Sequence, residues 1–258
     1  HYSKYFRKYT SQGIAWKILS YFLNRQDEQS AKRFDRFIVL TYEDKENWGR
    51  LPNIEVIPNP CAFKTDSMAD TSSKRIIAVG RYCVQKGFDR LIDCWNVVHQ
   101  VYSDWKLEIF GDGELRSFLQ NRIDALGVKD SVLLKSVTTH IEDEYLNSSI
   151  FVLPSRFEGL PLVLMEAMEC GVPPVAFTCK CGPKDIIENG VNGYLVENGD
   201  IRGFADSLMQ LMADQDLRKK IGIDAKQTMT RYTVENIMKE WDRLFHELVE
   251  ITSRTENK

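Results

Sequence analysis

The segment SRFEGLPLVLMEAMECGVPPVAF, from Ser155 to Phe177, is the most informative stretch of this chain. Its residues Gly159 and Pro161 predict a turn into a helix, because glycine permits unusual backbone angles and proline suits the first helical position. From Leu162 to Met168 the residues are apolar except for one glutamate. A surface helix would show a polar face, so we predict a helix that is buried on most sides.

Two carboxylates occupy this segment: Glu158 just before the helix start and Glu166 inside the apolar helix. A carboxylate in such a helix needs a partner, since burying an unpaired charge is costly. The helix start offers unpaired N–H groups and the positive end of the helix dipole, which favour phosphate. A ligand with a phosphate and hydroxyl groups would satisfy both features. A bond from Glu166 to a neighbouring Arg or Ser in a purely structural core would explain the helix equally well.

A second segment favours the ligand hypothesis. The residues RIIAVG, Arg75 to Gly80, predict a short buried strand; a glycine turn with Arg81 and Lys86 follows, and then a helix from Phe88 to about Tyr102. Open α/β sheets bind phosphate ligands outside the carboxyl ends of their strands. Arg offers a planar fork to phosphate oxygens and Lys a mobile charge. In isolation such loop residues are usually just solvated, but beside the glutamate helix they indicate a phosphate site.

The remaining pattern predicts an α/β fold with a Rossmann-like parallel sheet and flanking helices. Strand-like runs alternate with helical or turn-rich segments, which is typical of parallel sheets. Near the N-terminus, two further runs predict strands, the second of which ends in the proline-bounded segment Pro58 to Pro60. The predicted strands cover Phe37 to Thr41, Ile54 to Ile57, Lys106 to Phe110, Val132 to Leu134, Ile150 to Leu153, Pro174 to Phe177 and Gly193 to Val196.

Four motifs together resemble the donor-binding half of the family-four retaining glycosyltransferases, which have the GT-B fold. They are GRYCVQKG (Gly80 to Gly87), FGDGEL (Phe110 to Leu115), LPSRFEGLPLVLMEAMECGVPPVAF (Leu153 to Phe177) and GPKDIIENGVNGYLV (Gly182 to Val196). The resemblance extends roughly from Ile54 to Glu250. Glu158 and Glu166, with seven residues between them, match the paired-glutamate motif of that family.

The resemblance implies a role for each matched residue. Arg81 and Lys86 would grip the diphosphate of the donor, and Glu166 would bond the ribose hydroxyls. Glu158, with the backbone of Gly159 and Leu160, would hold the transferred sugar. The implied catalytic residues are Glu158, Arg81 and Lys86, and the implied donor-binding residues are Glu166, Gly159, Leu160, Pro161, Leu162 and Gly80.

The implied reaction is retaining transfer from a UDP- or GDP-sugar to a glycan or lipid-linked acceptor, in the synthesis of cell-surface polysaccharide or lipopolysaccharide. The leaving diphosphate accepts the proton of the acceptor, and Arg81 and Lys86 stabilise the charge that grows on it. Neither a metal nor a cofactor is then expected. Three alternatives remain: a sugar-nucleotide epimerase, a glycogen-type phosphorylase, and a non-catalytic sugar-nucleotide binding module. The phosphorylase would need a lysine for pyridoxal phosphate in a pattern that we do not find.

The resemblance also implies a domain plan. Residues 1–57 would be the tail of an acceptor-side domain, 58–70 a hinge, 71–232 the donor-binding domain and 233–258 a C-terminal helix that braces the N-terminal domain. The rest of the acceptor side would lie ahead of His1, so this chain by itself is expected to be inactive. His1 is either the remnant of an active-site histidine or an ordinary residue. Glu169 replaces a small residue of the family and is expected to face solvent or the hinge.

Composition agrees with this prediction. With 258 residues, of which 43% are hydrophobic, the chain can bury one core and part of a second, and no run is long enough to span a membrane. A net charge of −3 gives no reason to expect nucleic acid. The six cysteines lack zinc-site spacing and include Cys179-Lys180-Cys181, so we expect reduced thiols and a cytoplasmic location.

Residues 1–26 contain basic and aromatic side chains and no acidic one. In an amphipathic helix this mixture suits peripheral contact with an anionic membrane, on its inner face. Packing of the aromatic residues on a domain outside this chain is an equally good explanation.

Two short motifs have simpler explanations than the cofactors they suggest. Asp214-Gln215-Asp216 has the form of a DxD metal motif, but it opens a helical run in which acidic residues serve as caps. Gly111 and Gly113 form a GxG after a strand, but Arg116 stands where a dinucleotide fingerprint requires its third glycine.

Overall fold

The computed structural model describes residues 27–256, which fall into two compact units. Within the described residues, one unit contains the chain up to Pro58 and from Met238 onward, and the other contains Asn59–Ile237. The chain order is β1 (Phe37–Val39), α3 (Tyr42–Trp48), β2 (Ile54–Val56), β3 (Arg75–Val79), η1 (Val84–Lys86), α4 (Phe88–His99), β4 (Lys106–Phe110), α5 (Arg116–Ala125), β5 (Val132–Lys135), α6 (Ile141–Leu146), β6 (Ile150–Leu153), α7 (Leu162–Glu169), β7 (Pro174–Phe177), α8 (Pro183–Ile186), β8 (Tyr194–Val196), α9 (Ile201–Ala213), α10 (Gln215–Met229), η2 (Thr230–Tyr232) and α11 (Val234–Glu256).

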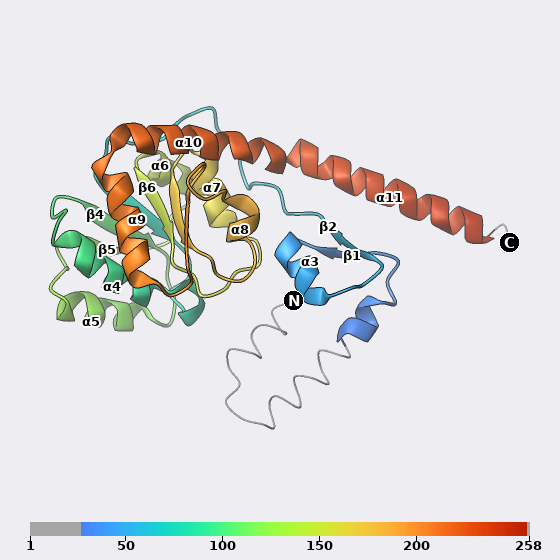
Figure 1. The fold of residues 1–258 in the computed structure, drawn as a ribbon, viewed down its shortest axis with the longest axis horizontal. Helices are drawn as coiled ribbons and strands as arrows, with labels where there is room; N and C mark the ends of the chain where they lie inside the picture. The colour runs from blue at the N-terminus through green and yellow to red at the C-terminus, as the bar shows by residue number, and fades with distance from the viewer. Residues whose placement is uncertain (1–26, 257–258) are drawn as a thin grey trace, which may run out of the picture. The chain divides into compact units, whose positions relative to one another are not determined.

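The larger unit is built on a six-stranded parallel sheet with helices on both faces (Figure 1). The strand order is β5-β4-β3-β6-β7-β8, and every neighbouring pair is parallel. The chain therefore adds strands outward from β3 in one direction and outward from β6 in the other. The boundary between β3 and β6 is a topological switch point, and ligands of open α/β sheets bind in the crevice outside the carboxyl ends of the strands at such a point.

Both faces of the sheet are buried, as its almost continuous apolar strands require. On one face, Ile76 and Ile150 join the core formed with α4, α5 and α9. On the other face, Ile77 and Phe151 are also fully buried, and the ring of Phe151 lies edge-on to that of Tyr145 in α6. Helix α7 contacts β6 and β7 on its way between them. This sandwich fixes the loops at the carboxyl ends of the strands.

The smaller unit pairs β1 with β2 in parallel and covers them with α3. Its core contains Val39, Trp48 and Ile54, and the hydroxyl of Thr41 caps α3 by accepting a hydrogen bond from the backbone N–H of Asp44 at 3.1 Å. Within the same unit, Arg243 of α11 forms an ion pair with Glu55 of β2. The cap that Thr41 forms satisfies one of the N–H groups that the start of α3 would otherwise leave unpaired.

The structure confirms the predicted fold class, with small changes at element ends. Helix α4 ends at His99, before the predicted Tyr102, because the chain turns at Val101, whose N–H bonds the carbonyl of Val98. Pro161 is the residue before α7 and not its first residue. None of the helices in the described part of the chain combines the length and the hydropathy of a membrane span. The predicted membrane contact of residues 1–26 lies outside the described residues.

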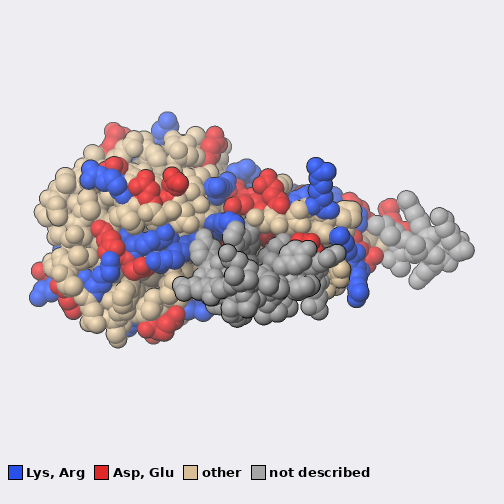
Figure 2. Space-filling model, turned by 60° about the horizontal axis from the view of Figure 1, so that its bottom comes forward, with Lys and Arg blue, Asp and Glu red and all other residues tan. Residues whose placement is uncertain are grey.

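Charged side chains of both signs are intermixed on the face of the molecule shown in Figure 2. This distribution agrees with the small net charge of −3. Nucleic-acid binding proteins typically gather Lys and Arg on one face. The visible described surface therefore does not have the pattern that would favour nucleic acid as a partner.

Candidate functional site

A cleft of about 420 Å³ opens at the carboxyl edge of the sheet. Loops that follow three neighbouring strands, together with α6 and α7, form its walls. Arg81 and Glu166, which the sequence predicted to share a ligand, both line it. Its lining residues are Val79, Gly80, Arg81, Phe110, Gly111, Asp112, Val137, Thr138, Ile141 and Glu166.

Close packing of two glycine loops shapes the floor of this cleft. The N–H of Gly80, directly after β3, donates to the carbonyl of Phe110 at 2.9 Å. A Cβ atom at Gly111 would lie 1.9 Å from the carbonyl oxygen of Gly80, so a side chain at position 111 would push the two loops apart. Gly111 is therefore required for close approach of the backbones, which is a simpler explanation of the GxG motif than a dinucleotide site.

Arg81 is exposed at the mouth of the cleft. Its guanidinium makes no hydrogen bond or ion pair with the side chains and backbone in residues 27–250. A planar group with five N–H donors is thus available to an anion, such as a diphosphate.

Lys86 and Glu158 form an ion pair next to this loop. The Nζ atom of Lys86, at the end of η1, lies 2.8 Å from Oε1 of Glu158. The hydroxyl of the buried Ser155 donates to the same Oε1 at 2.6 Å. Glu158 keeps only 5% of its side chain exposed. Its Oε2 accepts no hydrogen bond within the described part of the chain, so one carboxylate oxygen is free to receive a ligand hydroxyl.

Hydrogen bonds join the loop after β3 to the loop after β6. The guanidinium of Arg156 bonds both carboxylate oxygens of Asp89, at 2.8 and 2.5 Å, and its backbone N–H donates to the carbonyl of Gln85 at 2.7 Å. Although burial favours the neutral form of Asp89, the hydrogen bond and charge of Arg156 hold the pKa of this carboxyl below its usual value. These bonds tie the loop after β6 to η1 and to the first turn of α4, close to the contact between Lys86 and Glu158.

The turn from Glu158 to Leu162 leads into α7. The N–H of Glu158 donates to the carbonyl of Lys180 at 3.0 Å, which ties the turn to the loop after β7. A Cβ atom at Gly159 would meet no atom within 4 Å, so the space beside this residue is open. Leu160 is buried and Leu162 is partly exposed at the first turn of the helix. Gly159 thus lies beside an open space just before α7, next in sequence to Glu158.

Glu166 has a protein partner that the sequence did not indicate. The hydroxyl of Tyr145 donates to its Oε2 at 3.0 Å. Burial raises the pKa of Glu166 above the usual carboxyl value, and the bond from Tyr145 opposes this shift. Oε1 accepts no hydrogen bond from the residues that the structure describes. Neither an Arg nor a Ser satisfies this carboxylate, and one of its oxygens remains for a ligand in the cleft.

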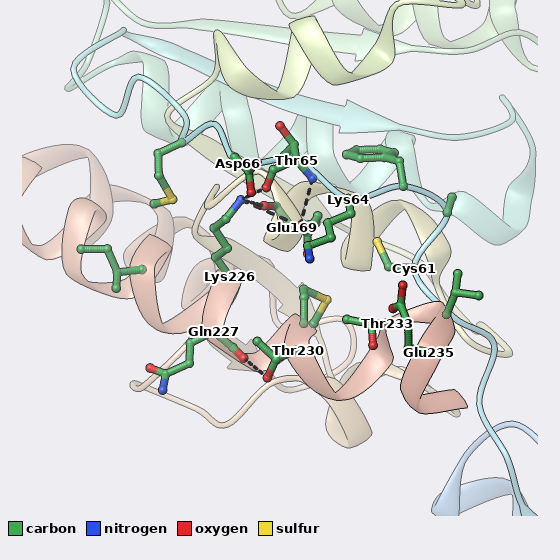
Figure 3. A pocket seen from close by; sticks show the side chains of 16 residues that line it. Cys61, Lys64, Thr65, Asp66, Glu169, Lys226, Gln227, Thr230, Thr233 and Glu235 are labelled. Carbon is green, nitrogen blue, oxygen red and sulfur yellow. Dashed lines mark hydrogen bonds and ion pairs between the residues drawn. The ribbon is translucent and has the colours of Figure 1, made fainter. Parts of the chain in front are cut away.

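Glu169 does not face solvent, in contrast to one of the two predicted orientations. It is 7% exposed and contacts the predicted hinge segment, where its Oε1 accepts a hydrogen bond from the N–H of Thr65 at 3.2 Å. Lys226 of α10 lies 3.8 Å from the same oxygen and donates to the carbonyls of Thr65 and Ser67 at 2.6 and 3.0 Å. Figure 3 shows these groups at the edge of a second cavity, of about 450 Å³. The second cavity shares none of the predicted donor-site residues.

We expect Glu169→Ala to lower the free energy of unfolding by about 1–3 kcal/mol, because it leaves the buried N–H of Thr65 without an acceptor. Chemical denaturation measures this change. Glu197→Ala, at an exposed position, is the matched control and is expected to stay within about 0.5 kcal/mol of the unchanged chain. Equal stability of the two variants would contradict the importance of the buried contact.

Local geometry bears on two other features of the sequence, the DxD-like motif at Asp214 and the cysteines. The carboxylate of Asp214 accepts a hydrogen bond from the N–H of Leu217 at 2.9 Å and caps α10, as expected for a helix start. Within the described residues, no group of three or more His, Cys, Asp or Glu side chains has a metal-binding arrangement. None of the six cysteines forms a disulfide in the structure. Sequence reasoning missed Tyr145 and Ser155, since neither belongs to a pattern with the glutamate that it bonds.

The chain is similar to known glycosyltransferases. A family model described as glycosyl transferases group 1 matches residues 62–228. An uncharacterized glycosyltransferase of Haemophilus influenzae is 36% identical over 211 residues, which are 80% of this chain and 60% of that protein. The amylovoran biosynthesis glycosyltransferase AmsD of Erwinia amylovora is 35% identical over 222 residues, which are 82% of this chain and 62% of AmsD.

Solved structures are also similar to this chain. A crystal structure of a mutant of S. aureus TarM in complex with fondaparinux, alpha-GlcNAc-glycerol and UDP superimposes with a TM-score of 0.77 at 29% identity, covering 84% of this chain and 45% of TarM. The chain thus spans less than two thirds of the length of these relatives. Since the family model covers more than half of the chain, this protein belongs to the glycosyl transferases of group 1 and forms one half of a GT-B fold.

Proposed function

We propose that this chain binds a nucleoside-diphosphate sugar, with UDP as the nucleotide, and serves as the donor half of a retaining glycosyltransferase. The observation that carries the proposal is the cleft at the carboxyl edge of the sheet, where a guanidinium without a partner in the described residues, Arg81, and a half-buried carboxylate with one free oxygen, Glu166, line the same space. A diphosphate linked to a ribose presents an anion and two hydroxyls, which these groups can bind together.

The diphosphate would lie beside the loop that follows β3. Arg81 offers its planar donors, and Lys86 has three N–H donors, one of which bonds Glu158. The ribose hydroxyls would donate to Glu166. Apolar cleft residues, among them Val137 and Ile141, would contact the base. The open space at Gly159, next in sequence to Glu158, would receive the transferred sugar.

In the proposed reaction, the acceptor hydroxyl attacks the anomeric carbon from the face on which the diphosphate leaves. The bond between the anomeric carbon and the phosphate oxygen breaks, its electron pair goes to that oxygen, and the oxygen takes the proton of the acceptor. Arg81 and Lys86 stabilise the negative charge that develops there. This scheme gives a reason to expect no metal requirement, since two protein cations would stabilise the leaving group.

The relatives support the same substrate class. TarM was crystallised with UDP, and AmsD is named for the biosynthesis of the polysaccharide amylovoran. We therefore propose a glycan or lipid-linked acceptor, and a role in the synthesis of a surface polysaccharide. The alignments with the Haemophilus influenzae protein and with AmsD cover 60% and 62% of those proteins, so we propose for this chain the donor half of the reaction.

A thermal-shift panel tests the proposal. UDP is expected to raise the melting temperature, because a ligand at about 100 times its dissociation constant stabilises the folded state by about 2.7 kcal/mol. GDP and ADP are measured separately for comparison. The panel is repeated with excess EDTA, which is expected to leave the shift unchanged. The absence of a shift with UDP at millimolar concentration, in a protein that unfolds cooperatively, would overturn the proposed function. A shift that EDTA abolishes would overturn its metal independence.

A further inference from the structure

We propose that Tyr145 is a positioning residue for the donor: its hydroxyl holds one oxygen of Glu166 so that the other oxygen is presented to the ribose hydroxyls. This inference rests on the proposed function, because it assigns the support of a carboxylate that the proposed donor would contact. Tyr145 itself does not line the cleft. It would act only through Glu166.

The phenol of Tyr145 is held at both ends. Its side chain is fully buried in the larger unit, near the end of α6. The ring lies edge-on to that of Phe151 in the central strand β6, with centroids 6.1 Å apart, and the hydroxyl reaches Glu166 Oε2 at 3.0 Å. A buried, rigid donor restricts the carboxylate to one orientation. A free glutamate side chain would lose rotamer freedom on binding a ligand, so this restriction lowers the cost of binding.

Other buried tyrosines satisfy their hydroxyls in a different way. The hydroxyl of Tyr82 lies 2.7 Å from the carbonyl oxygens of Ile109 and Lys135, and that of Tyr232 donates to the carbonyl of Asp185 at 3.1 Å. These bonds have backbone acceptors and serve the fold. The partner of Tyr145 is instead an ionisable side chain that lines the cleft. A role in ligand binding accounts for this difference.

The hydrogen bond from Tyr145 affects the pKa of Glu166, and this effect can be measured. Burial raises the pKa of Glu166, and the bond from Tyr145 lowers it, so loss of the hydroxyl is expected to raise this pKa further. Burial also raises the pKa of the nearby Cys61, and that of Cys170 to about 12, so both thiols stay neutral near pH 7. The elements around Glu166 carry several other titratable and charged groups. Among them are Tyr145, Glu142, Asp143 and Glu144 on α6, Glu169 and Cys170 at the end of α7, Asp216, Arg218, Lys219, Lys220, Asp224 and Lys226 on α10, Cys61 in the segment before β3, and Arg81 and Asp112 across the cleft.

The test is the affinity for UDP of Tyr145→Phe as a function of pH, measured by calorimetry on the full chain. Loss of one hydrogen bond is expected to weaken binding at neutral pH by about three- to tenfold. Only ionised Glu166 accepts bonds from both ribose hydroxyls, so the affinity of the variant is expected to begin falling at a higher pH than that of the unchanged chain. Glu166→Gln, measured in parallel, separates this fall from the titration of the phosphate.

Tyr232→Phe is the matched control, because it removes a half-buried tyrosine hydroxyl of the same unit away from the cleft. It is expected to keep the affinity and pH profile of the unchanged chain. A ring-fluorinated tyrosine at position 145, which is a stronger donor of similar size, is expected to shift the profile to lower pH and does not depend on the folding of the phenylalanine variant.

Three outcomes are decisive. The inference is supported if Tyr145→Phe weakens UDP binding and shifts its pH profile to higher pH, and the fluorinated tyrosine shifts the profile to lower pH. If the unchanged chain binds UDP and Glu166→Gln weakens it, but both changes at Tyr145 leave the affinity and pH profile unaltered, the inference is wrong and the proposed function stands. If the unchanged chain does not bind UDP, the proposed function itself fails.

Discussion

Arg81→Ala is expected to bind UDP about 10- to 100-fold more weakly than the unchanged chain, since a hydrogen bond to a charged group contributes about 1.5–3 kcal/mol. The guanidinium of Arg81 lines the cleft and has no partner in the described residues that would compete with phosphate. Removal therefore takes away ligand binding without breaking a contact that supports the fold. Calorimetric titration with UDP measures the loss, and the melting temperature of the free protein is expected to stay unchanged.

The control for this change is Arg202→Ala, on the exposed face of α9, where the arginine forms an i,i+4 ion pair with Asp206. It alters the net charge by the same amount and is expected to keep the affinity for UDP. Uridine, which lacks phosphate, is expected to bind the unchanged chain and Arg81→Ala equally. Equal UDP affinities of the two arginine variants would contradict the assignment of Arg81 to the diphosphate.

Glu166→Gln is expected to weaken UDP binding by about tenfold or more, because the ribose hydroxyls lose a charged acceptor. The amide has nearly the shape of the carboxylate, so the packing of α7 is expected to survive. The deciding measurement compares UDP with 2′-deoxy-UDP. The unchanged chain is expected to prefer UDP, and the variant is expected to lose most of this preference, since coupling between two partners disappears when either is removed.

Glu197→Gln, at an exposed site, provides the matched control and is expected to keep the preference for UDP. A Glu166→Gln protein that still discriminates UDP from 2′-deoxy-UDP as strongly as the unchanged chain would show that Glu166 is not the ribose acceptor. A purely structural role of Glu166 in the core would then be the better explanation.

Much of the larger unit could be predicted from sequence, because most of its strands are short, largely apolar runs with a glycine or proline at one end. The strand Arg75–Val79 and the following turn with Arg81 show why the site could also be located. Parallel strands bring the loops at their carboxyl ends to one edge. Once the strands were assigned, Arg81 and Glu166 were expected on the same side, and the cleft brings them together.

The partners of these residues could not be predicted, because they depend on contacts between distant segments. Helix α6 has the sequence IEDEYL, which gives no sign that Tyr145 reaches Glu166, 21 residues later. Lys86 and Glu158 are 72 residues apart and meet only because β3 and β6 are neighbours. Of the two orientations expected for Glu169, the structure has the one toward the hinge segment, where the N–H of Thr65 bonds it; its second partner, Lys226, is 57 residues away and was not indicated by the sequence.

The most direct test of the donor-site assignment is a crystal structure of this protein with UDP. We predict the diphosphate beside Arg81 and Lys86, the ribose hydroxyls within hydrogen-bond distance of Glu166, and the base against Val137 and Ile141. UDP bound elsewhere, for example in the second cavity beside Cys61 and Lys226, would contradict the account. An empty cleft in crystals grown at saturating UDP would contradict it as well.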